Sequence, residues 1–174
     1  RPRISTASAT YSCWPVAATS DGKYAYLANG TDGLRIYAVT NAYNPTNVGH
    51  IDNGGVAYSV AVLSNYVYLA NGIDGLRVYD VSDPASPSNV GHTNDGGVAG
   101  VAYGVAVSGI YCYLANGLDG LRVYNISNHA NPTMIGHAGN PSSIYANAVA
   151  VSGNYAYVAN YGNGLDVYDV SDPT

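Results

Sequence analysis

Short stretches in which large and small apolar residues alternate run along the whole chain, and clusters of Gly, Asn, Asp and Pro separate them. Within residues 55–98 this pattern predicts four β-strands, at 58–62, 66–70, 76–81 and 88–92. The Asn-Gly and Asp-Gly pairs between the second and third strands accept the left-handed backbone conformations of tight turns. The pattern therefore predicts a small antiparallel sheet.

This pattern recurs along the chain. The segment 26–37 returns at 68–79 and 113–124, and in a looser form at 157–168, with a period of roughly 43 residues. Four antiparallel strands at this period are typical of a propeller blade, which has two apolar faces and must stack on its neighbours. A β-sandwich would not require so regular a period, and the coils of a β-solenoid are usually shorter.

We therefore predict an all-β fold, a single β-propeller domain of four-stranded blades. The expected blades are residues 12–54, 55–98, 99–142 and 143–174, the last completed by an N-terminal strand in residues 1–11.

The two ends of the chain also fit the repeat. The chain stops at Ser171-Asp-Pro-Thr174, within a phrase that the second repeat completes, and it begins with Arg1-Pro-Arg-Ile4, which supplies most of the remainder. With no initiating Met and no signal peptide, we interpret it as a processed chain or part of a longer one. Three assemblies stay open: a four-bladed ring closed in cis, an eight-bladed ring of two chains, or strand exchange into a polymer.

Composition narrows the function classes. The chain has 18 Tyr, no Phe, no Glu, no Gln and one Lys, and charged residues make up 10% of it, against roughly 25% in ordinary soluble domains. So weakly charged a surface favours assembly or a glycan coat, the alternative being an ordinary mildly acidic surface. A net charge of -5 without a basic cluster argues against nucleic-acid binding. No apolar run approaches the roughly 18 residues of a membrane span.

Two phrases carry a family resemblance: LANGIDGLRVYDVSDPASPSNVGH at 69–92, and VAVSGNYAYVAN with GLDVYDVSDP within 149–173. The chain resembles the LVIVD repeat family of bacterial and archaeal surface or secreted proteins. The resemblance implies a β-propeller and an extracellular location. It implies no activity, because one fold hosts many functions.

Three kinds of polar residue recur at equivalent places, which favours a role in building each blade. They are the third-strand Arg35, Arg77 and Arg122, replaced by Asp166 in the fourth repeat; the loop Asp32, Asp74 and Asp119; and the outer-strand His50, His92 and His137. We expect the arginines to bond turn aspartates or carbonyls rather than to form a ligand-binding ring. One Asp per loop is too few for calcium, and histidines on separate blades cannot share a metal. We predict neither a metal nor a cofactor.

Catalytic patterns are missing from the sequence. There is no Glu, the aspartates are spread over turns rather than paired for acid–base chemistry, and no nucleophile elbow, phosphate loop or Cys–His pairing occurs. We therefore expect a protein that is not an enzyme.

One position, at the entry to the innermost strand, varies among the repeats. It holds Trp14, Tyr58, Tyr103 and Asn147 in turn. In a propeller this position lies near the mouth of the central channel, where aromatic faces and an amide suit the binding of a sugar or a peptide. The alternative is that the rings simply plug the channel.

Two sequons and two cysteines complete the candidates. Asn29 and Asn125 begin Asn-x-Ser/Thr sequons, and Asn29 is expected on an exposed hairpin loop. Cys112 takes the strand place of Val67 and Ala156, which predicts a buried apolar role, and its pairing with Cys13 stays open.

The function we expect is an extracellular structural or interaction module of a surface layer, adhesin or fibre. We expect it to associate with copies of itself, as a homo-oligomer or a head-to-tail fibre, and we name glycans as a second class of partner. The alternative is a lectin-like propeller that binds a carbohydrate or peptide at the channel mouth.

Overall fold

The protein is built from four small antiparallel β-sheets. The computed structural model describes residues 16–18, 22–94, 100–139 and 145–173, and these residues contain no helix. Each repeat of the sequence forms one sheet, whose strands follow one another in chain order. The predicted all-β fold is confirmed. No helix in the described ranges has the length and hydrophobicity that crossing a membrane requires.

The first three sheets have four strands each, and the last has three among the described residues. The strands are β1 (Val16–Ala18), β2 (Tyr24–Ala28), β3 (Leu34–Ala38) and β4 (Thr46–Ile51); β5 (Ser59–Leu63), β6 (Tyr66–Ala70), β7 (Leu76–Asp80) and β8 (Ser88–Thr93); β9 (Gly104–Ser108), β10 (Tyr111–Ala115), β11 (Leu121–Asn125) and β12 (Thr133–Ala138); and β13 (Tyr145–Ser152), β14 (Tyr155–Tyr161) and β15 (Gly164–Asp169).

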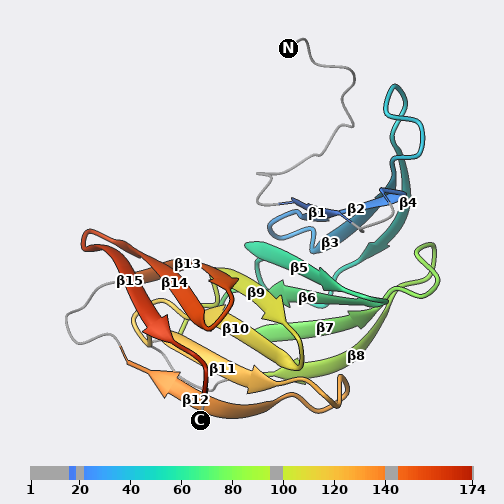
Figure 1. Ribbon diagram of the computed structural model, residues 1–174. Coiled ribbons are helices and arrows are strands. Elements are labelled where there is room, and N and C mark those ends of the chain that lie inside the picture. The colour runs from blue at the N-terminus through green and yellow to red at the C-terminus, as the bar shows by residue number, and fades with distance from the viewer. Residues whose placement is uncertain (1–15, 19–21, 95–99, 140–144, 174) are drawn as a thin grey trace.

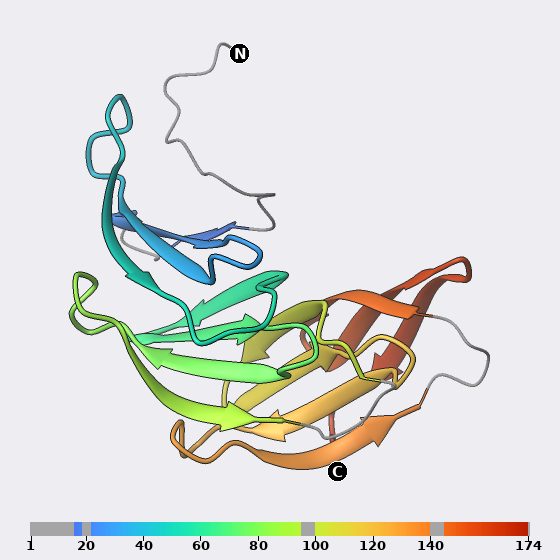
Figure 2. The same cartoon turned by 180° about the vertical axis from the view of Figure 1, so that it is seen from behind.

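The sheets stack face to face along an arc (Figure 1). The first strands β5, β9 and β13 line its concave side, where β5 contacts β9 and β9 contacts β13, and the last strands β4, β8 and β12 lie on its convex side. The view from behind shows the first and last sheets at opposite ends of the arc (Figure 2). This arrangement of four-stranded sheets is propeller-like.

The predicted strands of the second repeat differ from the observed ones by one residue at four ends. The first strand was expected at 58–62 and lies at Ser59–Leu63, and the last extends to Thr93, which pairs with Leu76. The third ends at Asp80, and the N–H of Val81 then donates to the carbonyl of Asn65, at the turn that precedes β6. The N-terminal strand expected in residues 1–11 lies outside the described residues.

A hydrophobic core fills each of the three spaces between neighbouring sheets. Tyr68, Ala70, Leu76 and Val78 of the second sheet pack on the facing side chains of the third, which are Ala102, Val105, Cys112, Leu114, Tyr124 and Ile126. The spaces before and after it are filled by equivalent residues. The second and third sheets therefore each bury one face against the sheet before them and the other against the sheet after them.

Cys112 takes part in this packing. Its thiol is free and its side chain is fully buried, which confirms the predicted apolar role. Burial raises the pKa of the Cys112 thiol, so the reactive thiolate is suppressed. Cys13 lies outside the described residues.

Glycines of the outer strands allow a second contact between sheets. A Cβ added to Gly91 of β8 would lie 2.2 Å from the carbonyl oxygen of His129, in the turn between β11 and β12. Gly49 and Pro84 make the same approach one sheet earlier, at 1.9 Å. No real Cβ comes so close to a backbone atom, so these strands require glycine where the turn of the next sheet rests on them.

Replacing one of these glycines should weaken the packing between sheets. We expect Gly91→Ala to lower the free energy of unfolding by about 2–3 kcal/mol, because the turn at His129 has to move away from the new methyl group. Urea denaturation followed by tyrosine fluorescence measures the change. The control is Gly139→Ala, where the Cβ would meet only the His137 ring at 3.7 Å. Equal losses in the two variants would contradict the contact.

Candidate functional site

A cluster of four polar side chains closes the loop between the second and third strands. In the second sheet, Asn71 Nδ2 donates to Asp74 Oδ2 at 2.8 Å, and Arg77 donates through Nε at 2.6 Å and through a terminal nitrogen at 3.0 Å. His92 Nε2 donates to the Asp74 carbonyl oxygen at 2.8 Å. The cluster therefore joins the loop to both strands that follow it.

The same cluster recurs in the first and third sheets. Its members there are Asn29, Asp32, Arg35 and His50, and Asn116, Asp119, Arg122 and His137. This confirms that the arginines bond turn aspartates, and it places the aspartates as turn residues. In the fourth sheet Asp166 occupies the arginine position, and Asn160 Nδ2 donates to its Oδ2 at 2.6 Å. In this sheet the carboxylate that accepts from the asparagine therefore comes from strand β15 and not from the loop.

The asparagines of this cluster were not recognised as a set from the sequence. The signal was present, because the pair Ala-Asn stands at the end of the second strand in all four repeats. The asparagines of these pairs are Asn29, Asn71, Asn116 and Asn160. All four side chains are buried. A buried amide must find hydrogen-bond partners, and the carboxylate supplies one.

The charges of the cluster settle the protonation state of its aspartates. Burial raises the pKa of Asp74, but hydrogen bonds from Arg77 and Asn71 outweigh it, and the pKa lies below its usual value. The hydrogen bond from Arg35 lowers the pKa of Asp32 in the same way. These carboxylates are therefore held ionised against arginine rather than poised for proton transfer.

The three outer-strand histidines do not converge. His50, His92 and His137 belong to β4, β8 and β12, in three different sheets, and each bonds the loop carbonyl of its own sheet. Among the residues that the structure describes, no three His, Cys, Asp or Glu side chains form a group that could hold a metal ion.

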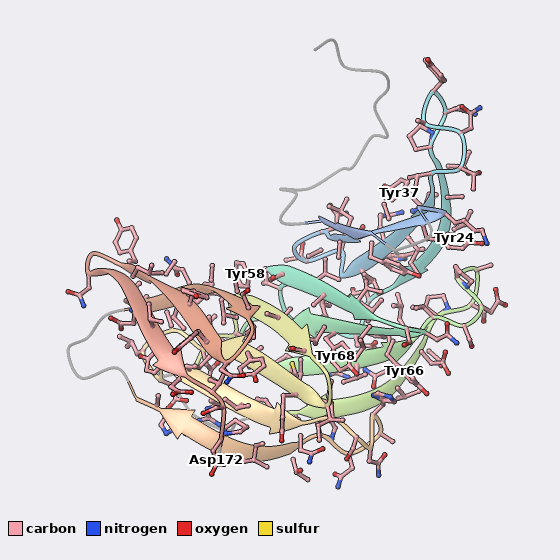
Figure 3. The ribbon with its side chains drawn as sticks, in the orientation of Figure 1. Tyr24, Tyr37, Tyr58, Tyr66, Tyr68 and Asp172 are labelled. Atoms are coloured by element: carbon pink, nitrogen blue, oxygen red, sulfur yellow. The ribbon has the colours of Figure 1, made fainter. Side chains whose placement is uncertain are left out.

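Two of the four residues predicted at the channel mouth meet directly. The rings of Tyr58 and Tyr103, from neighbouring sheets, lie with centroids 5.0 Å apart and planes tilted by 58°. Tyr58 lies where β5 begins (Figure 3). Both side chains are half-buried, so the pair keeps an exposed aromatic surface.

The third predicted residue, Asn147, lies next to this pair. It is exposed, at the bulge between Ala146 and Ala148 of β13. Its carbonyl oxygen would lie 3.0 Å from a Cβ on Gly104, the residue after Tyr103. Trp14 lies outside the described residues.

Sequence reasoning missed a further tyrosine at this place. Tyr145, at the start of β13, is 41% exposed, and its hydroxyl is close enough to affect Tyr103. Burial raises the pKa of Tyr103, and the hydroxyls of Tyr58 and Tyr145 raise it further. Tyr145 stands directly before Ala146, where the second and third repeats have Val56 and Val101, and this difference was the available signal. We call Tyr58, Tyr103, Tyr145 and Asn147 the tyrosine site.

The expectation that Asn29 lies exposed is wrong. Its side chain is fully buried and its Nδ2 donates to Asp32 at 2.7 Å, so the folded sheet does not present this nitrogen for a glycan. Asn125 is half-buried, and its Oδ1 accepts the N–H of Ser127 at 2.9 Å. Asp80 and Asp169 make the same turn in other repeats. Glycosylation of Asn125 stays a prediction.

A second departure from the repeat lies between the second and third sheets. His129 stacks on Tyr66 with ring centroids 3.7 Å apart, and its Nδ1 shares a hydrogen bond of 2.8 Å with the buried Tyr68 hydroxyl. A hollow of about 320 Å³ lies beside these rings. The equivalent turn positions hold Pro84 and Pro173, so His129 replaces a packing residue and satisfies a buried hydroxyl.

The profile of the LVIVD repeat matches four segments of the sequence, residues 19–53, 54–95, 99–138 and 145–174. The chain belongs to the LVIVD repeat family. Each matched segment of this LVIVD protein covers one sheet of the arc, except that β1 lies before the first segment. The resemblance seen in the sequence is confirmed. No curated protein matches the sequence.

Solved structures share the fold of the LVIVD protein. The computationally designed Ika4 protein is 9% identical, with a TM-score of 0.75 over 98% of this chain and 99% of that chain. The computationally designed Ika8 protein is 10% identical, with a TM-score of 0.72 over 94% of this chain and 47% of that chain. The LVIVD protein therefore spans about half the length of Ika8. At these identities the likeness concerns the fold alone.

The carboxylate–arginine bonds predict a loss of stability in acid. The folded-state pKa of Asp74 lies below the unfolded value near 3.9, so its contribution is full above pH ~4 and is lost as the pH falls through the folded pKa. We expect Asp74→Asn to cost about 1–2 kcal/mol at pH 7 and to reduce the dependence of unfolding on pH between about 5 and 2.5.

Urea denaturation at a series of pH values measures both effects. Asp83→Asn is the matched control, because the first and third repeats already carry Asn41 and Asn128 at this turn position. An acid dependence that Asp74→Asn leaves unchanged would exclude Asp74 as its source.

Proposed function

We propose that this LVIVD protein is a non-catalytic structural or interaction module that acts outside the cell, in a surface layer, an adhesin or a fibre. In this proposal its four sheets are blades of a β-propeller. One observation carries the proposal: the recurring charged side chains bond within their own sheets, as Asp74, Arg77 and His92 do. What remains for recognition is a surface of mostly neutral and apolar groups.

The electrostatics of the clusters support the non-catalytic part of the proposal. General acid–base chemistry needs a group whose pKa lies near the working pH. The loop aspartates instead have pKa values below the usual range, each beside an arginine. The Cys112 thiol is fully buried. These groups therefore serve the fold.

The composition of the surface supports the extracellular and assembling part. With 10% charged residues, copies of the chain repel one another weakly. Several large apolar or aromatic side chains are exposed, among them Tyr43, Tyr161 and Leu165. Such groups favour contact with another protein surface.

Electron microscopy of the native particle, taken from the source cell without detergent, tests the proposal. We expect the protein in an ordered array, a fibre or a surface-attached assembly, because its weakly charged surface suits close contact. The control is the same preparation from cells that lack the protein, in which the assembly should be absent. Dispersed particles inside the cell, or turnover of a substrate that a single Asp substitution abolishes, would contradict it.

The tyrosine site supports a second candidate, the binding of a carbohydrate or peptide. Tyr58 and Tyr103 offer adjacent ring faces, and Asn147 adds an exposed amide within the same region. Sugar rings stack on aromatic faces while amides bond their hydroxyls. The competing explanation is that the rings pack only on each other and on Gly72 and Gly117, which their edges approach.

Substitution of Tyr103 separates these explanations. We expect Tyr103→Ala to weaken binding on an array of glycans and peptides at least ~10-fold, because it removes one of the two adjacent ring faces on which a ligand would stack. Tyr103→Phe should keep the stacking and most of the binding. Tyr43→Ala is the control, since Tyr43 is 79% exposed and lies in the turn between β3 and β4. A wild-type protein that binds nothing on the array rules out this candidate.

A further inference from the structure

The last sheet exposes a face that the other three sheets bury. Leu165 and Val167 of β15 are 61% and 54% exposed. The residues at the Leu165 position of the earlier sheets are Leu34, Leu76 and Leu121, and none is more than 2% exposed. The residues at the Val167 position, which are Ile36, Val78 and Val123, are no more than 4% exposed. We call the side chains of Leu165 and Val167 with Ala159 the terminal face.

The first sheet carries the opposite surface. Inside the arc, a face such as that of Leu76 and Val78 is covered by Cys112, Leu114 and Ile126 of the sheet that follows. In the first sheet these covering positions are held by Ala25, Leu27 and Val39, which are only partly buried. The residues at the Leu27 position in the other sheets, Leu69, Leu114 and Val158, are at most 1% exposed. We call Ala25, Leu27 and Val39 the initial face.

These two faces are the two halves of one interface. The chain forms this interface three times between its own sheets, each time from the same strand positions. The terminal face thus matches the initial face in chemistry and in register. An apolar surface of this kind is expected to be covered in the assembled protein.

The curvature of the arc decides which initial face can cover it. Both views place β15 and the first sheet at opposite ends of the arc, so the two faces of one chain do not meet (Figures 1 and 2). The match to Ika8 extends over 94% of this chain and 47% of that longer one. Four sheets at this curvature therefore correspond to half of a longer array of the same fold.

We propose that the occupant of the terminal face is the initial face of a second copy of this chain. Two copies, related by a two-fold axis, form a closed ring of eight sheets with two identical joints. The inference rests on the proposed function, because it names the first partner of the interaction module. The ring closes because the four sheets of each copy cover half of a full rotation about the ring axis. A joint with a different rotation angle would instead continue into a filament.

One residue makes the joint different from the interfaces inside the chain. Tyr161, 75% exposed, stands where the first three sheets have Gly30, Gly72 and Gly117. Those glycines exchange backbone hydrogen bonds with the next sheet, as Gly72 does with Ala102 at 2.9 and 3.2 Å. At the joint between copies a tyrosine side chain replaces this backbone bridge. The interface between two copies therefore differs at this position from the interface between two sheets of one chain.

Light scattering of the purified 174-residue chain gives the first test. The ring has a mass of 36 kDa, twice the 18.0 kDa of one chain. We expect Leu165→Asp, which places a charge in both joints, to weaken dimerisation at least 100-fold and to give 18 kDa at micromolar concentration. Ile110→Asp is the matched control, because Ile110 is 49% exposed outside the terminal face and should leave the mass at 36 kDa. Wild-type protein of 18 kDa, or of heterogeneous mass, overturns the ring.

Mixing two variants shows that unlike faces meet. Leu165→Asp alters the terminal face and Leu27→Asp alters the initial face, so each variant alone has two damaged joints. A mixed pair has one intact joint, and we expect it to associate at least 10-fold more tightly than either variant alone, as measured with one variant fluorescently labelled. Circular dichroism establishes that each variant is folded, and the wild-type mass decides the ring if one is not. Folded variants that do not associate on mixing overturn the joint.

The ring and the proposed function fail in different ways. A monomeric wild-type chain that still occurs in a cell-surface array overturns the ring and leaves the function. A 36 kDa ring that turns over a substrate overturns the function and leaves the ring.

Discussion

A twisted sheet of this size is apolar on both faces, and every other feature of the molecule follows from the need to cover both. Leu76 and Val78 are buried only because the third sheet packs on them, and Leu114 is buried by the same contact. At about 25 cal/mol per Å² of apolar surface, one such interface contributes several kcal/mol, while an isolated sheet would keep little of it. The same strand position is 0% exposed at Leu76 and 61% exposed at Leu165, so the ends of the stack lack the contact that stabilises its middle.

This constraint explains which residues repeat. Glycine recurs at the position of Gly91 because the turn of the next sheet rests on its backbone. The Asn71–Asp74–Arg77 cluster recurs because it closes the loop that contains Gly72, whose backbone bonds Ala102 before the next sheet. Residues that differ from the repeat are not needed for this packing between sheets. His129, Tyr145 and Tyr161 are of this kind, and they lie at the hollow, the tyrosine site and the end of the arc. Candidate functions therefore gather where the repeat is broken.

The sequence was sufficient for the features that depend on local pattern. Alternation and turn residues predicted the strands of the second repeat to within one residue. The recurrence of the third-strand arginines predicted a bond to a turn aspartate or carbonyl, and Arg77 makes this bond with Asp74. The burial of Asn29 could not be predicted locally, since a loop between strands is normally exposed. Asn71 shows the reason, because its Nδ2 also donates at 2.6 Å to the carbonyl of Gly54, which lies 17 residues away in the segment between two sheets. The position of Tyr145 beside Tyr103, and the curvature of the arc, likewise depend on how sheets are placed against each other.

The use of one interface both inside the chain and at its ends has a consequence for specificity. A surface built from repeated positions fits every other copy of the repeat, so a terminal face with the standard residues would accept any initial face of the family. Discrimination has to come from positions that do not repeat. Tyr161 is such a position, because it replaces a glycine at the rim of the terminal face. In the proposed ring, the fourth repeat therefore departs from the others at a place that meets the partner sheet.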